Sequence, residues 1–225
     1  MCVHASGRGG RSIASWHEPT RRLLAATLIG GGYGGTTSAL NDLSSAYGDL
    51  GAALAGTQVQ FVLRVISTMT GAGWAWAALA VAVGWYLGTR HWGAAAGALA
   101  LTAATATYYA LDESLRAEPV LDSDIWIWCV AGLLLGMPLG TVGAYARRAG
   151  PLGLLAALTV PAGAAVQMVV LPPGVDGVQV AAEAIWARWL VWLISAICSL
   201  WLIAHYRRAR PAHRAADIAA DQSYA

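Results

Sequence analysis

The chain has no lysine, and charged residues make up only 12% of its 225 positions. A soluble domain usually carries about 25% charged residues. This shortage argues against a soluble globular protein. The formal net charge is only +2, so the composition implies no nucleic-acid partner.

Signatures of metal and catalytic sites are also missing. The three cysteines, Cys2, Cys129 and Cys198, form no CxxC or Cys/His pair, so we expect buried free thiols. The five histidines show no ligand spacing, and the chain has no EF-hand, HExxH, GxSxG or phosphate-binding glycine loop. We therefore expect no metal site, no cofactor and no catalytic residue.

Hydrophobic residues are abundant, at 57% of the chain. Crossing about 30 Å of hydrocarbon takes roughly 20 residues of α-helix. Six apolar segments approach that length: 23–40, 71–88, 93–111, 125–146, 152–171 and 184–206. They predict an all-α fold, a polytopic membrane helix bundle with six transmembrane helices.

The arginines predict how this bundle is oriented. Eleven of the 14 lie at the chain ends or in every second connection: Arg8, Arg11, Arg21, Arg22, Arg90, Arg147, Arg148, Arg207, Arg208, Arg210 and Arg214. Acidic residues such as Asp42, Asp112 and Asp176 lie in the other connections. Basic loops of membrane proteins stay on the cytoplasmic side. We therefore expect a cell-membrane protein with both termini inside, a basic N-terminal segment at 1–22, a membrane domain at 23–206 and a cytoplasmic tail at 207–225.

The first apolar segment has a second interpretation. Arg21 and Arg22 precede it, as the arginines of a twin-arginine export signal precede an apolar run. No clear small-x-small cleavage site follows, so we expect the segment to be retained as a membrane span.

The connection from 41 to 70 is the only long one. Its apolar residues Val59, Val62, Leu63 and Ile66 have helical spacing, and Arg64 lies on the opposite side. This pattern predicts an amphipathic helix at the outer membrane surface, with the Arg64 stem snorkelling. The alternative is a re-entrant lid over a cavity, in which Arg64 reaches for an anion.

Glycine spacing predicts which helix faces pack. Gly132, Gly136 and Gly140 recur every four residues in the fourth segment, and Gly30 and Gly34 do so in the first. Small residues at this spacing let helix backbones approach closely. The two segments also begin corresponding three-helix halves, and interrupted helices at corresponding places can mark a transporter's binding site. A cavity between spans one and four is therefore an alternative to simple packing.

Few other polar residues offer chemistry. Arg188 lies within the sixth segment, with Glu183 just before it, and polar residues crowd the outer end of the third segment. Solvated groups explain this crowding; the alternative is a divalent-cation site or an acid–base pair. The candidate ligand or polar-contact residues are Arg64, Tyr108, Asp112, Glu113, Arg116, Glu183 and Arg188.

Several stretches invite a family comparison. The segment Gly73–Ala80, the basic turn Thr89–Trp92 and the Ala-rich run Gly93–Leu101 resemble a family of small actinobacterial multi-pass membrane proteins. That family has no assigned function. The resemblance implies an uncharacterised integral membrane protein and supplies no catalytic residue.

Three function classes follow. We expect a non-enzymatic helix bundle that binds a lipid or a membrane-protein partner, which includes a second copy of the chain. The first alternative is a small permease or transporter subunit with a cavity between spans one and four. The second is a membrane enzyme that uses the outer carboxylates.

Overall fold

The computed structural model describes residues 14–45, 49–116, 123–174 and 181–222, and this part of the chain is all-α. Long runs of alanine, leucine and other good helix formers account for the helices, since lipid leaves no other partner for backbone groups. The helices are α1 (Ala14–Ser44), α2 (Asp49–Ala53), α3 (Gln58–Gly71), α4 (Gly73–Leu87), α5 (Arg90–Arg116), α6 (Ser123–Ala146), α7 (Pro151–Val170) and α8 (Ala182–Gln222).

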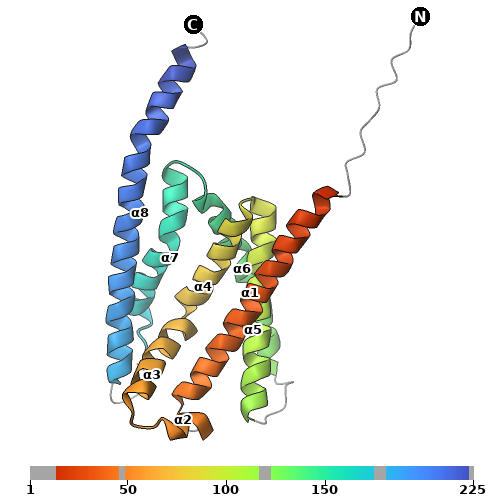
Figure 1. Cartoon of the computed structure of the whole chain (residues 1–225), viewed down its shortest axis with the longest axis vertical. Helices are drawn as coiled ribbons and strands as arrows, with labels where there is room; N and C mark the ends of the chain where they lie inside the picture. Colours follow the sequence, from red (N-terminus) through yellow and green to blue (C-terminus); the bar gives the residue numbers. More distant parts are fainter. Residues whose placement is uncertain (1–13, 46–48, 117–122, 175–180, 223–225) are drawn as a thin grey trace, which may run out of the picture.

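The long helices form one bundle, in which α1 begins and α8 ends at the same end (Figure 1). Helix α5 packs along α1 and along α6, and α4 packs against α5, α6 and α7. Helix α8 packs against α7 and, nearer its start, against α3. Helix α3 thus lies between α1 and α8, as a continuation of α4 across a bend.

Two glycines make the tight turns at the basic end. Gly88 ends α4 in the left-handed conformation at φ 73°, and its N–H donates to the Gly84 carbonyl. Gly150, at φ 101°, separates α6 from α7, which begins with Pro151. Glycine tolerates such φ values, and proline is preorganised for the first helical position.

The interior of the bundle is built from small residues. Ala26, Ala80, Ala96, Ala100 and Ala104 are fully buried. Their size lets the helix backbones approach closely, as is typical of membrane helices.

The spaced glycines lie at these backbone contacts. A Cβ added at Gly30 or Gly34 would overlap the backbone of Ala100 or Ala104 on α5. Beside these contacts on α5, Gly136 and Gly140 of α6 face the backbones of Gly97 and Gly93, and Gly132 faces Leu101. Helix α5 is therefore packed backbone to backbone against both α1 and α6.

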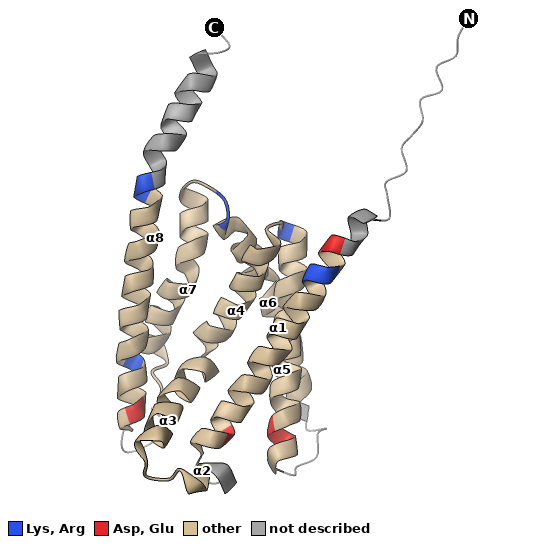
Figure 2. Ribbon diagram, in the orientation of Figure 1, with Lys and Arg blue, Asp and Glu red and all other residues tan. Residues whose placement is uncertain are grey.

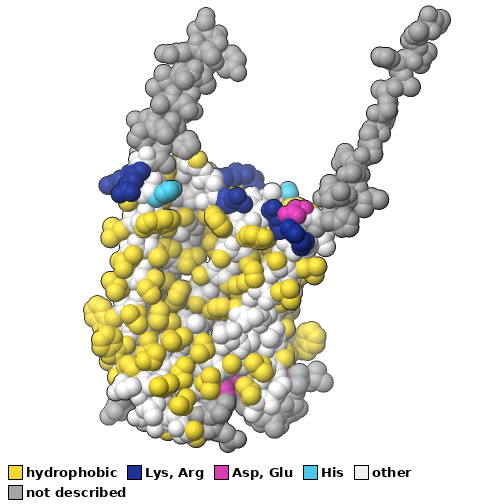
Figure 3. Space-filling view, viewed as in Figure 1, with side chains coloured by type: hydrophobic (Ala, Val, Ile, Leu, Met, Phe, Trp, Pro, Cys, Tyr) yellow, Lys and Arg dark blue, Asp and Glu magenta, His cyan; other side chains and the backbone are white. Residues whose placement is uncertain are grey.

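The outer surface of the helix bundle is largely apolar. Hydrophobic side chains cover the face of the molecule below a rim of arginine (Figure 3). Trp189, Leu193 and Leu200 of α8 are more than half exposed, as are Leu134 and Leu135 of α6. Exposed apolar surface on this scale indicates contact with lipid. Cys198 is also exposed, so our expectation of buried thiols is wrong for this residue, although Cys129 and Cys198 are both free.

Four helices, α5 to α8, are long and apolar enough to cross a membrane, and α3 with α4 adds a fifth if the bent pair is one span. The prediction of an all-α membrane bundle is therefore supported, with four or five candidate spans in the described residues. Helix α1 contains the first predicted span, but glycine, threonine and serine make it more polar than these helices. The predicted span 71–88 is interrupted at its start, because α3 ends at Gly71 and α4 begins at Gly73.

Charge separates the two ends of the bundle (Figure 2). Arg22 lies near the start of α1, Arg90 begins α5 and Arg147 follows α6, whereas Asp42 lies near the end of α1 and Glu183 near the start of α8. Glu18 also lies near the start of α1, and it pairs with Arg21 and Arg22. The helix fold thus gathers the arginines of separate connections on one side.

Candidate functional site

The backbone is irregular where α3 meets α4. The two helices meet at a 60° bend. Ala72, flanked by Gly71 and Gly73, ends one helix and begins the other with extended φ and ψ of −70° and 143°. Glycine disfavours continued helix, and a helix broken here exposes unpaired carbonyl and amide groups.

Two polar side chains from distant helices bind these backbone groups. The Tyr33 hydroxyl of α1 donates to the Thr70 carbonyl at 2.6 Å. The Trp74 amide donates to Oε1 of Gln167 on α7 at 2.8 Å. Both ends of the break are therefore hydrogen-bonded by side chains from other helices.

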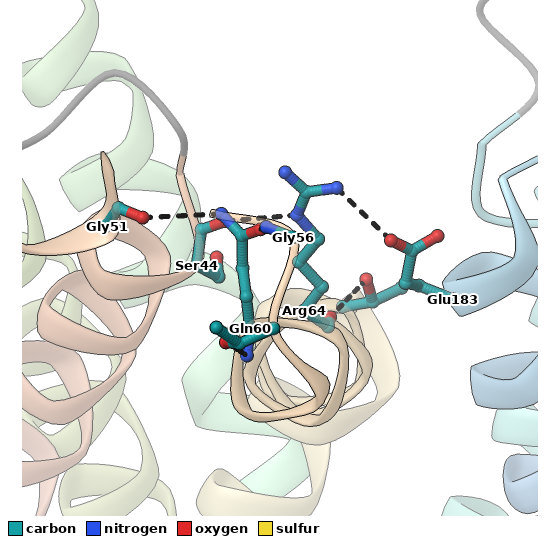
Figure 4. A network of polar contacts seen from close by, with 8 residues as sticks. Ser44, Gly51, Gly56, Gln60, Arg64 and Glu183 are labelled. Carbon is teal, nitrogen blue, oxygen red and sulfur yellow. Dashed lines mark hydrogen bonds and ion pairs between the residues drawn. The ribbon is translucent and has the colours of Figure 1, made fainter. Parts of the chain in front are cut away.

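An ion pair joins α3 to α8 on the same side of the break. The Arg64 guanidinium donates from Nη1 to Oε1 of Glu183 at 3.1 Å (Figure 4). Its Nε donates to the Ser44 carbonyl at the end of α1, also at 3.1 Å. Glu183 lies in the first turn of α8, where the helix dipole favours a negative charge. Arg64 therefore ties three helices together.

Gln60 anchors the start of α3 beside this pair. It is only 4% exposed. Its side chain accepts from the Gly56 amide at 3.0 Å and donates to the Gly51 carbonyl at 3.4 Å (Figure 4). Thr57 caps the same helix by accepting from the Gln60 amide. These contacts hold the first turn of α3 in place, one turn before Arg64.

A cleft of about 510 Å³ opens between α1, α3, α7 and α8 beside the break. Arg64 and Glu183 lie on its wall with several neutral polar side chains. The polar lining residues are Asn41, Ser44, Arg64, Ser67, Thr68, Gln167 and Glu183. We refer to it as the polar cleft.

A second cleft of about 510 Å³ lies on the other side of the break, between α4, α5 and α6, and Gly71 lines both. It is rich in aromatic residues. Edge-to-face contacts join Tyr33 to Trp76 at 5.6 Å, Trp76 to Tyr108 at 6.1 Å and Tyr108 to Tyr109 at 5.4 Å between ring centroids. Asn41 also donates to the Tyr108 hydroxyl at 3.4 Å, which links the aromatic row to the polar cleft.

The structure brings together only some of the residues singled out from the sequence. Arg64 and Glu183 meet in the polar cleft, and Tyr108 lines the aromatic one. Arg188 lies apart, on the exposed face of α8, in another cleft of about 500 Å³ that Pro172 and Trp192 also line. The polar side chains gather between α1, α3, α7 and α8, rather than between α1 and α6, which hold the first and fourth predicted spans.

The outer carboxylates show no assembled site in the described residues. Glu113 is 8% exposed, and its Oε2 has no hydrogen-bond partner there. Asp112 is half-buried and makes contacts of its own. The described part of the chain has no group of three or more metal-ligating side chains, and the Arg116 side chain lies outside it.

Sequence reasoning missed Tyr33, Asn41 and Gln167. A signal for Gln167 existed, because it is the one amide side chain in the apolar segment 152–171. The predicted helix over 59–66 is present as α3. Helix α3 packs between α1 and α8 and meets α4 at a bend, an arrangement that also fits a re-entrant segment or a broken span.

Comparison with known proteins adds no assignment. The chain matches no family model, no curated protein sequence and no solved structure. Function must therefore be inferred from the site itself.

Proposed function

We propose that this chain is a six-span protein of the cell membrane, with both termini cytoplasmic, and that its polar cleft binds a small polar solute as part of a permease or transporter subunit. The main observation that supports this proposal is the broken helix formed by α3 and α4. In transporters, substrates bind where an interrupted helix presents backbone groups inside the membrane. Here the α3–α4 break has that form and opens onto a polar cleft.

Helix length supports placing the break inside the bilayer. Helix α4 has 15 residues, which is about 22 Å at 1.5 Å per residue. The hydrocarbon is about 30 Å thick, so α4 cannot cross it alone. Helix α3 supplies the remaining length of this membrane crossing. It also carries Arg64, Ser67 and Thr68, which line the cleft.

The cleft's charge favours a neutral or zwitterionic solute. Arg64 and Glu183 neutralise each other, and the other polar lining groups are amides and hydroxyls. Such groups can both donate and accept hydrogen bonds. An inorganic ion would have to compete with the ion pair itself.

Water access to the cleft is the direct test. In a chain without its three cysteines, Ser67→Cys is expected to react with a membrane-impermeant thiol reagent applied outside the cell, because Ser67 lines the cleft. The matched control is Ile194→Cys on the exposed apolar face of α8, which should stay unlabelled. Absence of Ser67→Cys labelling in a folded protein would refute an aqueous cleft.

The same variant identifies the solute class. We expect amino acids or polyols to slow labelling of Ser67→Cys, whereas chloride and phosphate should not. Labelling that no solute class slows would refute solute binding while leaving the cleft in place.

The charge segregation and the length of α1 support the proposal of six spans with both ends inside. That helix has 31 residues, or about 46 Å, which exceeds the hydrocarbon thickness. Alkaline phosphatase, which is active only outside, should be active when fused after Gly174 and inactive when fused after Gly150 or Ala225. Activity after Ala225 would contradict the proposed orientation.

A further inference from the structure

A second cleft with charged walls lies at the opposite, basic end of the bundle. It has a volume of about 480 Å³ and opens between the α6–α7 turn and α8. Arg147, Arg148 and His205 line it at the basic end, and the apolar residues Leu154 and Leu202 line it further along α7 and α8 toward the middle of the bundle. We refer to it as the basic cleft.

Positive charge converges beside this cleft, and no acidic side chain that the structure describes is paired with it. The guanidiniums of Arg90 and Arg148 lie 4.8 and 4.6 Å from the centre of the same ring, Tyr145. Neither they nor Arg147 form an ion pair within the described part of the chain. Glu18 is already engaged by Arg21 and Arg22. Like charges brought this close favour binding of an anion between or beside them.

The arginines of the turn have different tasks. Arg147 stacks on Trp85 at 5.5 Å and points Nη1 at the Trp85 and Tyr86 carbonyls, at 3.5 Å each, at the end of α4. A cation at a helix C-terminus is favourable, so Arg147 has a structural role. Arg148 stacks on Tyr145 and donates no hydrogen bond to a described residue, which leaves its N–H groups for a ligand.

We propose that the basic cleft binds an anionic phospholipid. Arg148 and His205 hold the phosphate, and an acyl chain follows the apolar wall between α7 and α8. The apolar wall continues onto the outer surface of α8, where Leu200 and Trp201 are 68% and 64% exposed. A free phosphate ion would use only Arg148 and His205. Basic pockets between membrane helices are suited to anionic lipid headgroups.

Lipid binding to the purified full chain tests this assignment. Native mass spectrometry should show phosphatidylglycerol retained in preference to phosphatidylcholine. Arg148→Gln is expected to weaken phosphatidylglycerol binding by about tenfold, since a charge-assisted hydrogen bond is lost. Arg21→Gln, which removes the same charge at the same end but outside the cleft, should leave binding unchanged. If both variants weakened lipid binding equally, the effect would come from net charge alone, and the proposed site would be refuted.

A second variant tests the apolar wall. Ala157→Phe fills the apolar part of the cleft without changing any charge, and it should also lower phosphatidylglycerol retention. A thermal unfolding curve like that of the unmodified chain shows that each variant is folded. Displacement of the lipid by inorganic phosphate at millimolar concentration would instead indicate a soluble-anion site and would overturn the lipid assignment.

Discussion

Gly34→Ala is expected to lower the free energy of unfolding by about 1 to 3 kcal/mol, the usual cost of overpacking a filled interior. A Cβ at this position would overlap the carbonyl group and Cα of Ala104. Backbone cannot rotate away as a flexible side chain can, so α1 and α5 must separate. The change is measured by unfolding the protein in mixed micelles, in which the fraction of a denaturing detergent is raised stepwise.

The control for this substitution lies on the same helix. Gly32 is exposed, and nothing lies within 4 Å of an added Cβ. Gly32→Ala should therefore be neutral, or stabilising by up to about 1 kcal/mol because alanine favours helix. Equal destabilisation by both variants would show that α1 and α5 do not pack through Gly34.

Gln167→Leu is expected to destabilise the protein by about 0.5 to 1.5 kcal/mol, the usual net contribution of one hydrogen bond. It removes the acceptor of the half-buried Trp74 amide at the start of α4. Tyr33→Phe, which removes the hydroxyl bound to the Thr70 carbonyl at the other side of the break, should have the same direction.

Gln58→Leu is the matched control for Gln167→Leu. Gln58 is exposed at the start of α3, so the same chemical change should have little effect on unfolding. Hydrogen exchange should also locate the effect, with faster exchange at the first turn of α4 in Gln167→Leu. Unchanged exchange and stability would mean that Gln167 does not brace the break.

Patterns local to one helix were predictable from the sequence. Apolar segment length anticipated the long helices, and four-residue glycine spacing pointed to the faces of α1 and α6 that lie against α5. Both depend on regular helix geometry, which relates residues only a few positions apart.

The polar cleft was not predictable, because its residues come together through tertiary packing. Arg64 and Glu183 are 119 residues apart, and each attracted attention alone. Their pairing depends on α3 fitting between α1 and α8, which no local pattern encodes. The helix break was not predictable for a related reason. Glycines such as Gly71 and Gly73 are also frequent in unbroken, packed membrane helices. The bend is recognised only from the hydrogen bonds that Tyr33 and Gln167 make to it.

The backbone-to-backbone contacts of α5 divide the bundle mechanically. Helices α1, α4, α5 and α6 form one closely packed layer, because main chains meet between α1 and α5, between α5 and α6, and between α4 and α6. The α7–α8 side packs instead through longer side chains such as Met168 and Val191, which can change rotamer. Compliance is therefore concentrated on the side that carries both the polar and the basic clefts, and a rocking motion of α7 and α8 against this layer would alter the two clefts together.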